Sequence, residues 1–537
     1  MLTGAAVADP PAARSRRWLD AACWTATLAL LLIFVRLLWR HGVDWPLHDD
    51  FTQILAIPGY LVQLDARGKV GQLFELSPEH RIATLRIAGW LFAQLPGGLD
   101  FRWLIALGNA MLLATGAYVA GWAPRALRAA IAVLAALLLT SVTHYGAQFW
   151  ATGALQHFGV SFYALTALAF LAGVRPRHAF AAAFALLAAF TSANGLLAFA
   201  AAALLLALRG RQRAAAAWLA AGVILCAAYF VGYETPPGRP GILRLVGDDP
   251  VALASFVLGT CGAIAHGFPA SMILGALVVA AWVAIIATGA WRRIPPALAG
   301  AALFGALSCA MIAVGRANLG VEAVGLSRYR VYSASLVLST IVAVAWVAPR
   351  ARALWLVGGS TVGAALLYVL ALPVFMPYLV ELSMSQRALR DHFAATGHAR
   401  YDGYSDEFGD FTLHRAEEIG AYRGTQKAQP ARSFTPGMPD RGVLSEPLRF
   451  DVLETTRIFS VSGWIAGAHR DVDVWLEGGG RAYRARIGSS RFWRGPARAP
   501  GTGFHGTLRT EGVAPGRYRL GFGDGAIAWT QREIVVE

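Results

Sequence analysis

Residues 18–40 read WLDAACWTATLALLLIFVRLLWR, an apolar run with Arg14, Arg16 and Arg17 just before it. A helix needs about 20 predominantly apolar residues to cross the hydrocarbon core of a bilayer. The run is too long for the apolar core of a signal peptide, and it has no small-residue cleavage site. We therefore predict that these residues form a retained first transmembrane helix.

Further apolar runs of span length follow the first one. They cover residues 100–122, 126–142, 154–172, 214–232, 271–290, 297–314, 331–348 and 353–373. The segment 178–208 is apolar over about 31 residues, too long for one upright span, and the turn residues Thr191 to Gly195 interrupt it. We predict two short spans there, which makes about eleven in all. We expect an interfacial or re-entrant helix at 251–267.

The composition also indicates a membrane protein. Of 537 residues, 56% are hydrophobic and 15% are charged, and the mean hydropathy is +0.50, outside the usual range of soluble proteins. The formal net charge is +15, but no basic run is interleaved with aromatic residues, which argues against nucleic acid as a partner. The four cysteines lie within apolar stretches and lack metal-ligand spacing.

Basic residues recur at regular intervals between the predicted spans. The clusters are Arg14 to Arg17, Arg125 and Arg128, Arg175 and Arg177, Arg209 to Arg213, Arg292 and Arg293, and Arg350 and Arg352. With eleven spans all these clusters fall on one side, and positively charged loops mark the cytoplasmic side. We therefore predict a cytoplasmic N-terminus. The first loop, 41–99, and everything after about residue 374 then lie on the far side of the membrane.

The chain changes character after the last apolar run. We divide it into a transmembrane domain, 1–375, a linker with some helix, 376–444, and a C-terminal domain, 445–537. In the last part, polar and apolar residues alternate in about seven short segments separated by Gly, Pro and Asp, which is typical of a small β-sandwich. The expected fold class is an α-helical polytopic membrane protein with a C-terminal extracytoplasmic β-sandwich. That domain either binds a glycan or only covers the site, and the sequence favours neither.

The first outer loop gathers titratable side chains in a chain that is otherwise poor in charge. The group consists of His48, Asp49, Asp50, Glu79, His80 and Arg81. Either aspartate could cap a helix that starts at Phe51, and Ser77-Pro78-Glu79 is itself a good helix start. Capping uses one oxygen at each place and does not account for the whole group. We therefore predict a functional site with Asp50, Asp49 and Glu79 as its catalytic carboxylates. His48, His80 and Arg81 are its expected substrate-binding residues.

A second group lies near the outer ends of two later spans. It consists of Arg316, Arg328, Tyr329 and Arg330. Arginines at span ends are usually interface anchors, but these lie on the side where the charge rule disfavours them. Because guanidinium groups bind phosphate oxygens in a bidentate way, we predict a lipid phosphate as their ligand. Gln156 and His157, where another span begins, are weaker candidates for hydrogen bonds to a sugar or headgroup.

In order and sidedness, these motifs resemble those of the GT-C superfamily of polytopic membrane glycosyltransferases. The matching features are His48-Asp49-Asp50 after the first span, Glu79-His80-Arg81 later in a long outer loop, and Ser327-Arg328-Tyr329 before a late span. The resemblance covers roughly residues 18–375 and is closest to bacterial members with an EHR loop. The chain departs from the mannosyltransferase pattern, which usually has an Asp-Glu pair after the first span, and this leaves donor and acceptor open.

The resemblance implies an enzyme of the bacterial cytoplasmic membrane with a periplasmic C-terminal domain. It would move a sugar, with inversion, from a polyprenyl-phosphate donor to an envelope glycan, lipid or protein acceptor. Asp50 or Asp49 would then be the general base. Arg328, helped by Arg316 or Arg330, would hold the leaving phosphate. Glu79 and His80 would orient the sugar or a divalent metal, so metal-independent and metal-assisted chemistry both remain open.

Two other functions fit part of the sequence. A lipid or glycan transporter or flippase would use the intramembrane Asn, Gln and His residues and the break at 191–195. Against it, no charged residue lies in the middle of a span and neither half of the chain is duplicated. A non-catalytic envelope glycan assembly protein would bind through its β-domain. It would leave the outer Asp, Glu and Arg residues unexplained.

Overall fold

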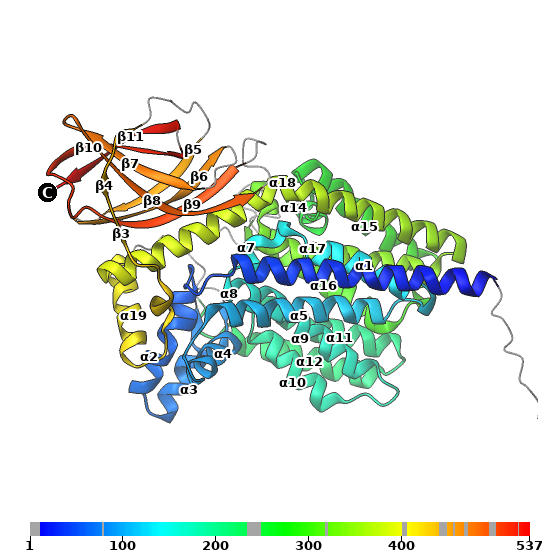
Figure 1. Ribbon diagram of the computed structural model, residues 1–537. Helices are drawn as coiled ribbons and strands as arrows, with labels where there is room; N and C mark the ends of the chain where they lie inside the picture. The colour runs from blue at the N-terminus through cyan, green and yellow to red at the C-terminus, as the bar shows by residue number, and fades with distance from the viewer. Residues whose placement is uncertain are drawn as a thin grey trace, which may run out of the picture.

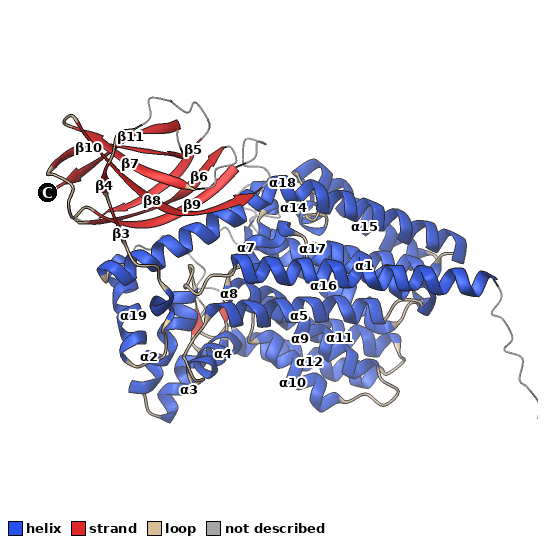
Figure 2. Ribbon diagram, viewed as in Figure 1, coloured by secondary structure: helices blue, strands red, loops and turns tan. Residues whose placement is uncertain are grey.

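Long apolar helices form a bundle, and the C-terminal strands form a sheet beside one end of it (Figures 1 and 2). The computed structural model describes residues 11–77, 80–233, 249–316, 321–399, 405–439, 448–454, 457–466, 471–492, 501–524 and 526–537. The prediction of a multi-pass membrane protein with a C-terminal β region is confirmed at this level.

The longest helices correspond to the apolar runs of the sequence. They are α1 (Pro11–His41), α5 (Phe101–Gly121), α6 (Arg128–Leu139), α9 (Gly159–Ala172), α12 (Gln212–Tyr229), α15 (Phe268–Ala287), α16 (Pro296–Arg316), α17 (Arg330–Val347) and α18 (Arg350–Thr396). Within the described ranges, eight helical stretches are long and apolar enough to cross a membrane. A ninth is present if the bent pair Arg125–Leu139 and Val142–Gln148 counts as one span. The total of about eleven stays a prediction.

The segment 178–208 is divided where the sequence predicted. Helices α10 (His178–Ala189) and α11 (Leu197–Leu208) are separated by the 3₁₀ turn η5 (Ala193–Leu196). Each helix has 12 residues, about 18 Å, which is shorter than the roughly 30 Å hydrocarbon core. A Cβ on Gly195 would lie 1.9 Å from the carbonyl oxygen of Ala188, so only glycine allows this turn to close. The hairpin therefore ends inside the bundle.

The expected short helix near 251–267 is α14 (Pro250–Cys261). Asp249 caps its first turn by accepting a hydrogen bond from the backbone N–H of Ala252, and Pro250 occupies the first helical position. With 12 residues it is too short to span a bilayer. Its depth in the membrane stays a prediction.

The arginine-rich loops lie together at the end of the bundle where α1 begins, and the sheet lies at the opposite end (Figure 1). Trp346 Nε1, near the end of α17, donates a hydrogen bond to the carbonyl of Trp122, just after α5. Arg209, just after α11, donates to the carbonyls of Leu171 and Gly173, where α9 ends. We call this the basic end and the opposite one the sheet end. Which compartment each faces stays a prediction.

Reporter fusions should place the two ends on opposite sides of the membrane. We expect a fusion after Arg211 to report the cytoplasm and a fusion after Glu537 to report the far side, because basic loops are retained in the cytoplasm. Paired alkaline phosphatase and green fluorescent protein fusions at both positions are the measurement. If both positions report the same side, the arrangement of spans is wrong.

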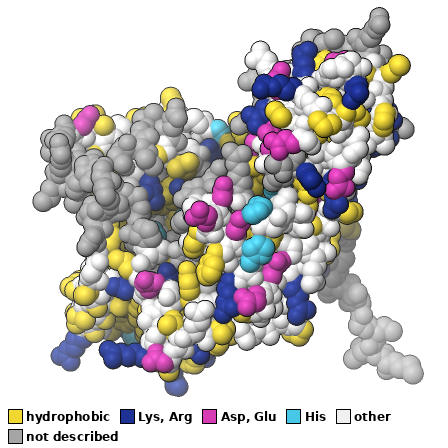
Figure 3. Space-filling view, turned by 90° about the vertical axis from the view of Figure 1, so that its left-hand side faces the viewer, with side chains coloured by type: hydrophobic (Ala, Val, Ile, Leu, Met, Phe, Trp, Pro, Cys, Tyr) yellow, Lys and Arg dark blue, Asp and Glu magenta, His cyan; other side chains and the backbone are white. Residues whose placement is uncertain are grey.

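Short helices cover the sheet end of the bundle. The first outer loop contributes η1 (Phe51–Leu55), α2 (Ala56–Gln63), α3 (Ala66–Phe74), β1 (Leu76–Ser77), β2 (His80–Arg81) and α4 (Ala83–Ala93). The loop after α6 contributes η3 (Val142–His144), α7 (Tyr145–Gln148), α8 (Ala151–Gly153) and the π-helix η4 (Ala154–Phe158), which continues into α9. Figure 3 looks onto this end and shows acidic, basic and histidine side chains spread over it.

Helix α18 joins the membrane bundle to the sheet. It has 47 residues, about 70 Å, more than twice the hydrocarbon thickness. Its last turns pack under the sheet, where His505 Nδ1 lies 3.1 Å from Met384 Sδ. The domain boundary expected at residue 375 falls inside this continuous helix, and the division into domains stays a prediction. After α18 come α19 (Asp406–Glu418) and η10 (Gly424–Lys427).

A charged contact fixes this segment to the first loop. Lys427 Nζ lies 2.5 Å from Asp44 Oδ2 and 2.9 Å from Asp100 Oδ2. The Asp44 carboxylate is buried and also accepts a hydrogen bond from the backbone N–H of Phe101. Tyr422, just before η10, donates its hydroxyl hydrogen bond to the carbonyl of Asp44. These bonds hold the start of the first loop, the start of α5 and the chain after α19 in one arrangement.

Within the described residues, the C-terminal region contains seven long strands and two short ones. The strands are β3 (Arg432–Ser433), β4 (Thr435–Pro436), β5 (Leu448–Glu454), β6 (Ile458–Ala466), β7 (Val472–Gly478), β8 (Arg481–Phe492), β9 (Gly501–Arg509), β10 (Gly516–Asp524) and β11 (Ala526–Val536). The seven long strands follow the order β11-β10-β7-β8-β9-β6-β5. Strand β8 pairs with β7 up to Ile487 and with β9 from Gly488 onward. That the C-terminal strands form a sandwich stays a prediction.

Candidate functional site

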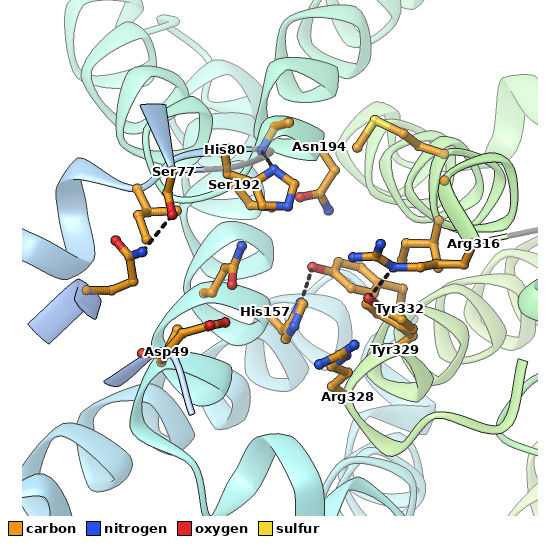
Figure 4. Close-up of a pocket in the computed structure, with 18 of the residues that line it drawn as sticks. Asp49, Ser77, His80, His157, Ser192, Asn194, Arg316, Arg328, Tyr329 and Tyr332 are labelled. Atoms are coloured by element: carbon orange, nitrogen blue, oxygen red, sulfur yellow. Dashed lines mark hydrogen bonds between the residues drawn. The ribbon is translucent and has the colours of Figure 1, made fainter. Parts of the chain in front are cut away.

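A cavity of about 430 Å³ opens among the short helices at the sheet end. Its walls come from the first outer loop, the α8–η4 segment, the hairpin between α10 and α11, the end of α16 and the start of α17 (Figure 4). Seven residues that the sequence singled out line it, namely Asp49, His80, Gln156, His157, Arg316, Arg328 and Tyr329. They come from distant parts of the chain, and the fold brings them together.

Asp49 is the one carboxylate among the described residues that faces this cavity. The residue before it, His48, has a left-handed backbone with φ of 46°, a conformation that costs a non-glycine residue of order 1–3 kcal/mol. The His48 ring does not line the cavity but packs edge-on against Trp150, with 5.7 Å between ring centroids. Trp150 Nε1 donates a hydrogen bond to the carbonyl of Leu47. These contacts fix the turn that directs Asp49 toward the cavity.

Asp50, expected as a catalytic carboxylate, is held by hydrogen bonds away from the cavity. Its side chain is buried and does not line the cavity. Oδ1 accepts hydrogen bonds from the backbone N–H and the hydroxyl of Thr152 at 2.7 and 2.6 Å, and Oδ2 accepts one from the backbone N–H of Leu47 at 3.0 Å. In this structure the oxygens of Asp50 hold the turn against α8, and its catalytic role stays a prediction.

The environment of Asp50 predicts how stability depends on pH. Burial raises the pKa of its carboxyl to about 7, although the hydrogen bonds from Thr152 and Leu47 oppose this shift. In the unfolded chain the pKa is about 4. The folded state therefore binds the proton more tightly, and this contribution to stability is complete below pH 4 and is lost as the pH rises through 7.

An Asp50→Asn variant should isolate that contribution. The amide keeps the size of the side chain and cannot ionise, so we expect the melting temperature of wild type minus that of the variant to fall as the pH rises from about 4 to about 8. Thermal unfolding of both detergent-solubilised proteins across this range is the measurement. A difference that stays constant with pH would show that Asp50 does not titrate in the folded protein.

Arg316 and Arg328 form the basic side of the cavity. Arg316 Nε donates a hydrogen bond to the hydroxyl of Tyr329 at 2.9 Å. The guanidinium carbons of Arg316 and Arg328 lie 5.9 and 5.1 Å from the centroid of the Tyr329 ring. The Nε of Arg328 is buried without a hydrogen-bond partner, and over the described ranges no carboxylate forms an ion pair with this residue. Two cations placed on one ring repel each other, so an anion bound between them would be stabilised.

Arg330 and Arg81 do not belong to the cavity. Arg330 is buried on another side of α17, where Nη1 lies 3.1 Å from His266 Nδ1 and the guanidinium stacks on Phe375. Residues two apart on a helix do not share a face, which separates it from Arg328. Arg81 donates hydrogen bonds to the carbonyls of Phe74, Tyr229 and Val231 and so ties the first loop to the end of α12. The structure thus places both arginines outside the cavity, and their roles in substrate binding stay predictions.

Imidazole, amide and hydroxyl groups form the rest of the wall. The ring of His157 lies with Nδ1 3.2 Å from the hydroxyl of Tyr332. His80 Nδ1 accepts a hydrogen bond from the backbone N–H of Ala193, in the hairpin turn. Gln156 and His157 lie on the π-helix η4, an irregularity that is frequent at functional sites. A sugar with several hydroxyl groups matches such a wall.

Asn194 is a cavity residue that the sequence did not single out. It lies in the turn between α10 and α11 and is only 3% exposed. Its Nδ2 donates to Ser308 Oγ at 3.3 Å, and its Oδ1 has no hydrogen-bond partner among the described atoms. Asparagine is an ordinary residue in a turn, so the sequence suggested no further role for it. Only the packing of the hairpin against α16 shows that the side chain reaches the cavity. An orphaned buried acceptor here can receive a ligand hydroxyl.

Glu79 lies outside the described residues. Its neighbours Ser77 and His80 both line the cavity. In the part of the chain that the structure covers, no three His, Cys, Asp or Glu side chains are grouped to hold a metal ion. No protein-family model, no curated protein and no solved structure matches this chain.

Proposed function

We propose that this protein is a membrane glycosyltransferase of the GT-C type, which moves a sugar from a polyprenyl-phosphate donor to a hydroxyl acceptor. The observation that supports it best is a single cavity with one carboxylate, Asp49, on one side and two arginines, Arg316 and Arg328, on the other (Figure 4). The volume of about 430 Å³ falls in the range of roughly 300–1,000 Å³ that is usual for small-molecule sites.

The proposed step is an inverting displacement at the sugar carbon. The acceptor oxygen forms a bond to this carbon while the bond from the carbon to the phosphate oxygen breaks. The leaving polyprenyl phosphate takes the electron pair and gains negative charge, which the guanidinium groups of Arg316 and Arg328 stabilise. The carboxylate of Asp49 accepts the proton of the acceptor hydroxyl. His80 and Asn194 orient the sugar hydroxyls.

The position of the cavity agrees with a donor that stays in the membrane. It is bounded by the ends of α16 and α17, so a headgroup can enter it while a polyprenyl chain remains beside the spans. In this proposal the sheet end faces the periplasm, the N-terminus is cytoplasmic and the acceptor is an envelope glycan, lipid or protein. The β-domain either binds the acceptor glycan or covers the site, and a bound divalent metal would take Asp49 or His80 as a ligand.

The test is turnover of a lipid-linked donor by purified protein in proteoliposomes. A panel of polyprenyl-phosphate sugars with radiolabelled sugar is incubated with envelope extract as the acceptor, with and without a divalent metal. We expect label to move to acceptor and free polyprenyl phosphate to form, and no transfer from the matching nucleotide sugars. Absence of transfer from every lipid-linked donor would contradict the proposal.

A further inference from the structure

A second cavity lies at the other end of the bundle, between α1 and the pair α5 and α6. The sheet-end half of α1 packs closely on the bundle, and Phe34 there is 1% exposed. The half nearer the basic end contacts the core through Cys23 and Leu30, and a groove of about 320 Å³ remains beside these contacts. Trp24 and Leu31 of α1 form one wall, and Gly116 and Ala117 of α5 are part of the opposite one.

The groove exists because α5 and α6 present small residues there. Gly116 and Ala117 on α5 and Ala132 on α6 do not reach the large side chains of α1. Thr27, one of two polar side chains in the lining, donates its hydroxyl to the carbonyl of Cys23. An apolar cavity gives water no hydrogen-bond partners. Inside a membrane, such a cavity is therefore filled by lipid hydrocarbon rather than by water.

The groove has the length of one leaflet. It follows α6 from Arg128 to Leu139, a helix of 12 residues, about 18 Å, which is a little more than half of the roughly 30 Å hydrocarbon core. A whole helix about 10 Å wide over this length would need roughly 1,300 Å³, four times the volume of the groove. A single acyl chain is narrow enough to enter it.

The groove has a positive charge at its basic end. Arg128 lines it there and is exposed, and its Nε donates to the carbonyl of Ala123. Its Nη groups therefore lie at the level where lipid headgroups sit. Arg125, one turn earlier, adds a second exposed charge nearby. Guanidinium groups bind phosphate oxygens strongly.

We infer that this groove is a binding site for one glycerophospholipid of the leaflet at the basic end. One acyl chain fills the space between α1, α5 and α6, and the lipid phosphate binds Arg128. The lipid supports the packing of α1 against α5 and α6. Because α1 leads directly into the turn at His48 and Asp49, a lipid bound in the groove also fixes the start of the first outer loop. This inference does not depend on the proposed function.

Two variants and two matched controls test the site. Ala117→Phe fills the groove, and Ala284→Phe adds the same ring to a lipid-facing position of α15 outside it. Arg128→Gln removes the phosphate ligand, and Arg352→Gln removes an exposed arginine near the start of α18. The full-length proteins are purified in mild detergent, and the phospholipid that remains bound is measured by phosphorus assay and lipid mass spectrometry.

We expect wild type and both controls to retain about one phospholipid and Ala117→Phe to lose it. Arg128→Gln should weaken rebinding about fivefold, about 1 kcal/mol at 1.4 kcal/mol per tenfold. Rebinding is followed by the gain in melting temperature when phosphatidylglycerol, phosphatidylethanolamine or phosphatidylcholine is titrated into delipidated protein. Stabilisation by any of the three supports a phosphate site, and their ranking identifies the headgroup. Equal retention by Ala117→Phe and wild type, or recovery of polyprenyl phosphate instead of phospholipid, would overturn the inference.

Discussion

Replacing Asp49 with Asn is expected to lower the rate of sugar transfer by about 100- to 10,000-fold, the usual contribution of a general base. The amide has the same size as the carboxylate but does not accept the proton of the acceptor hydroxyl. Asp49 is exposed to the cavity rather than buried in the protein. The variant should therefore fold and insert like wild type. Turnover of the lipid-linked donor in proteoliposomes, at equal protein amounts, is the measurement.

The neighbouring carboxylates give this prediction its controls. Glu75→Gln removes an exposed carboxylate of the same loop that does not line the cavity, and it should leave turnover unchanged. Asp50→Asn should act through stability, because its oxygens hold Thr152 and Leu47. If Asp49→Asn keeps normal turnover while Asp50→Asn loses it without loss of stability, the general base would be Asp50 after all.

The assignment of Asp49 and Asp50 shows where sequence reasoning stops. Both residues stand in the same motif, and their charges and neighbours in the chain are nearly equal. What separates them is the left-handed backbone at His48 and the hydroxyl of Thr152, about a hundred residues away. Neither feature can be recognised from the residues of the motif. The sequence could therefore predict that a carboxylate after the first span faces the site, but not which one.

The same holds for the arginines. Ser327 to Arg330 were recognised together because of their charge and sidedness, and the structure divides them. Arg328 faces the cavity, and Arg330 is buried beside His266 and Phe375. The 3₁₀ turn η9 (Ser327–Tyr329) ends between them, so helical periodicity could be applied only once the start of α17 was known.

Element types were predictable where a period was strong. Alternation of polar and apolar residues predicted the strands β6 to β11, and the length of the apolar runs predicted the long helices. The end of α18 was not predictable, because Pro373, Pro377 and the charged residues after them resemble the end of a span. Each proline removes only one intrahelical hydrogen bond, and contacts with the sheet, at Met384 and His392, stabilise the helix beyond them. Tertiary contacts that outweigh local helix propensity cannot be predicted from a single sequence.

The second large effect is expected for Arg328→Lys. Lysine keeps the positive charge but loses the planar fork that holds two phosphate oxygens at once. Arg328 has a buried Nε without a partner and stacks beside Arg316 on Tyr329. This is the arrangement expected of an anion-binding group. A donor that acts on charge developing in the transition state contributes about 2.7–4 kcal/mol, or 100- to 1,000-fold in rate. We expect a loss of this size in turnover of the lipid-linked donor.

A matched substitution separates this role from that of an interface anchor. Arg67→Lys makes the same change at an exposed position of α3 outside the cavity and should leave turnover unchanged. Because an anchor only needs a long chain with a charged end, it tolerates lysine. Both variants are compared with wild type at equal abundance in proteoliposomes, with the donor concentration varied so that binding and turnover are resolved. A loss of less than about threefold for Arg328→Lys, roughly 0.7 kcal/mol, would reduce this residue to an anchor and leave Arg316 as the remaining phosphate ligand.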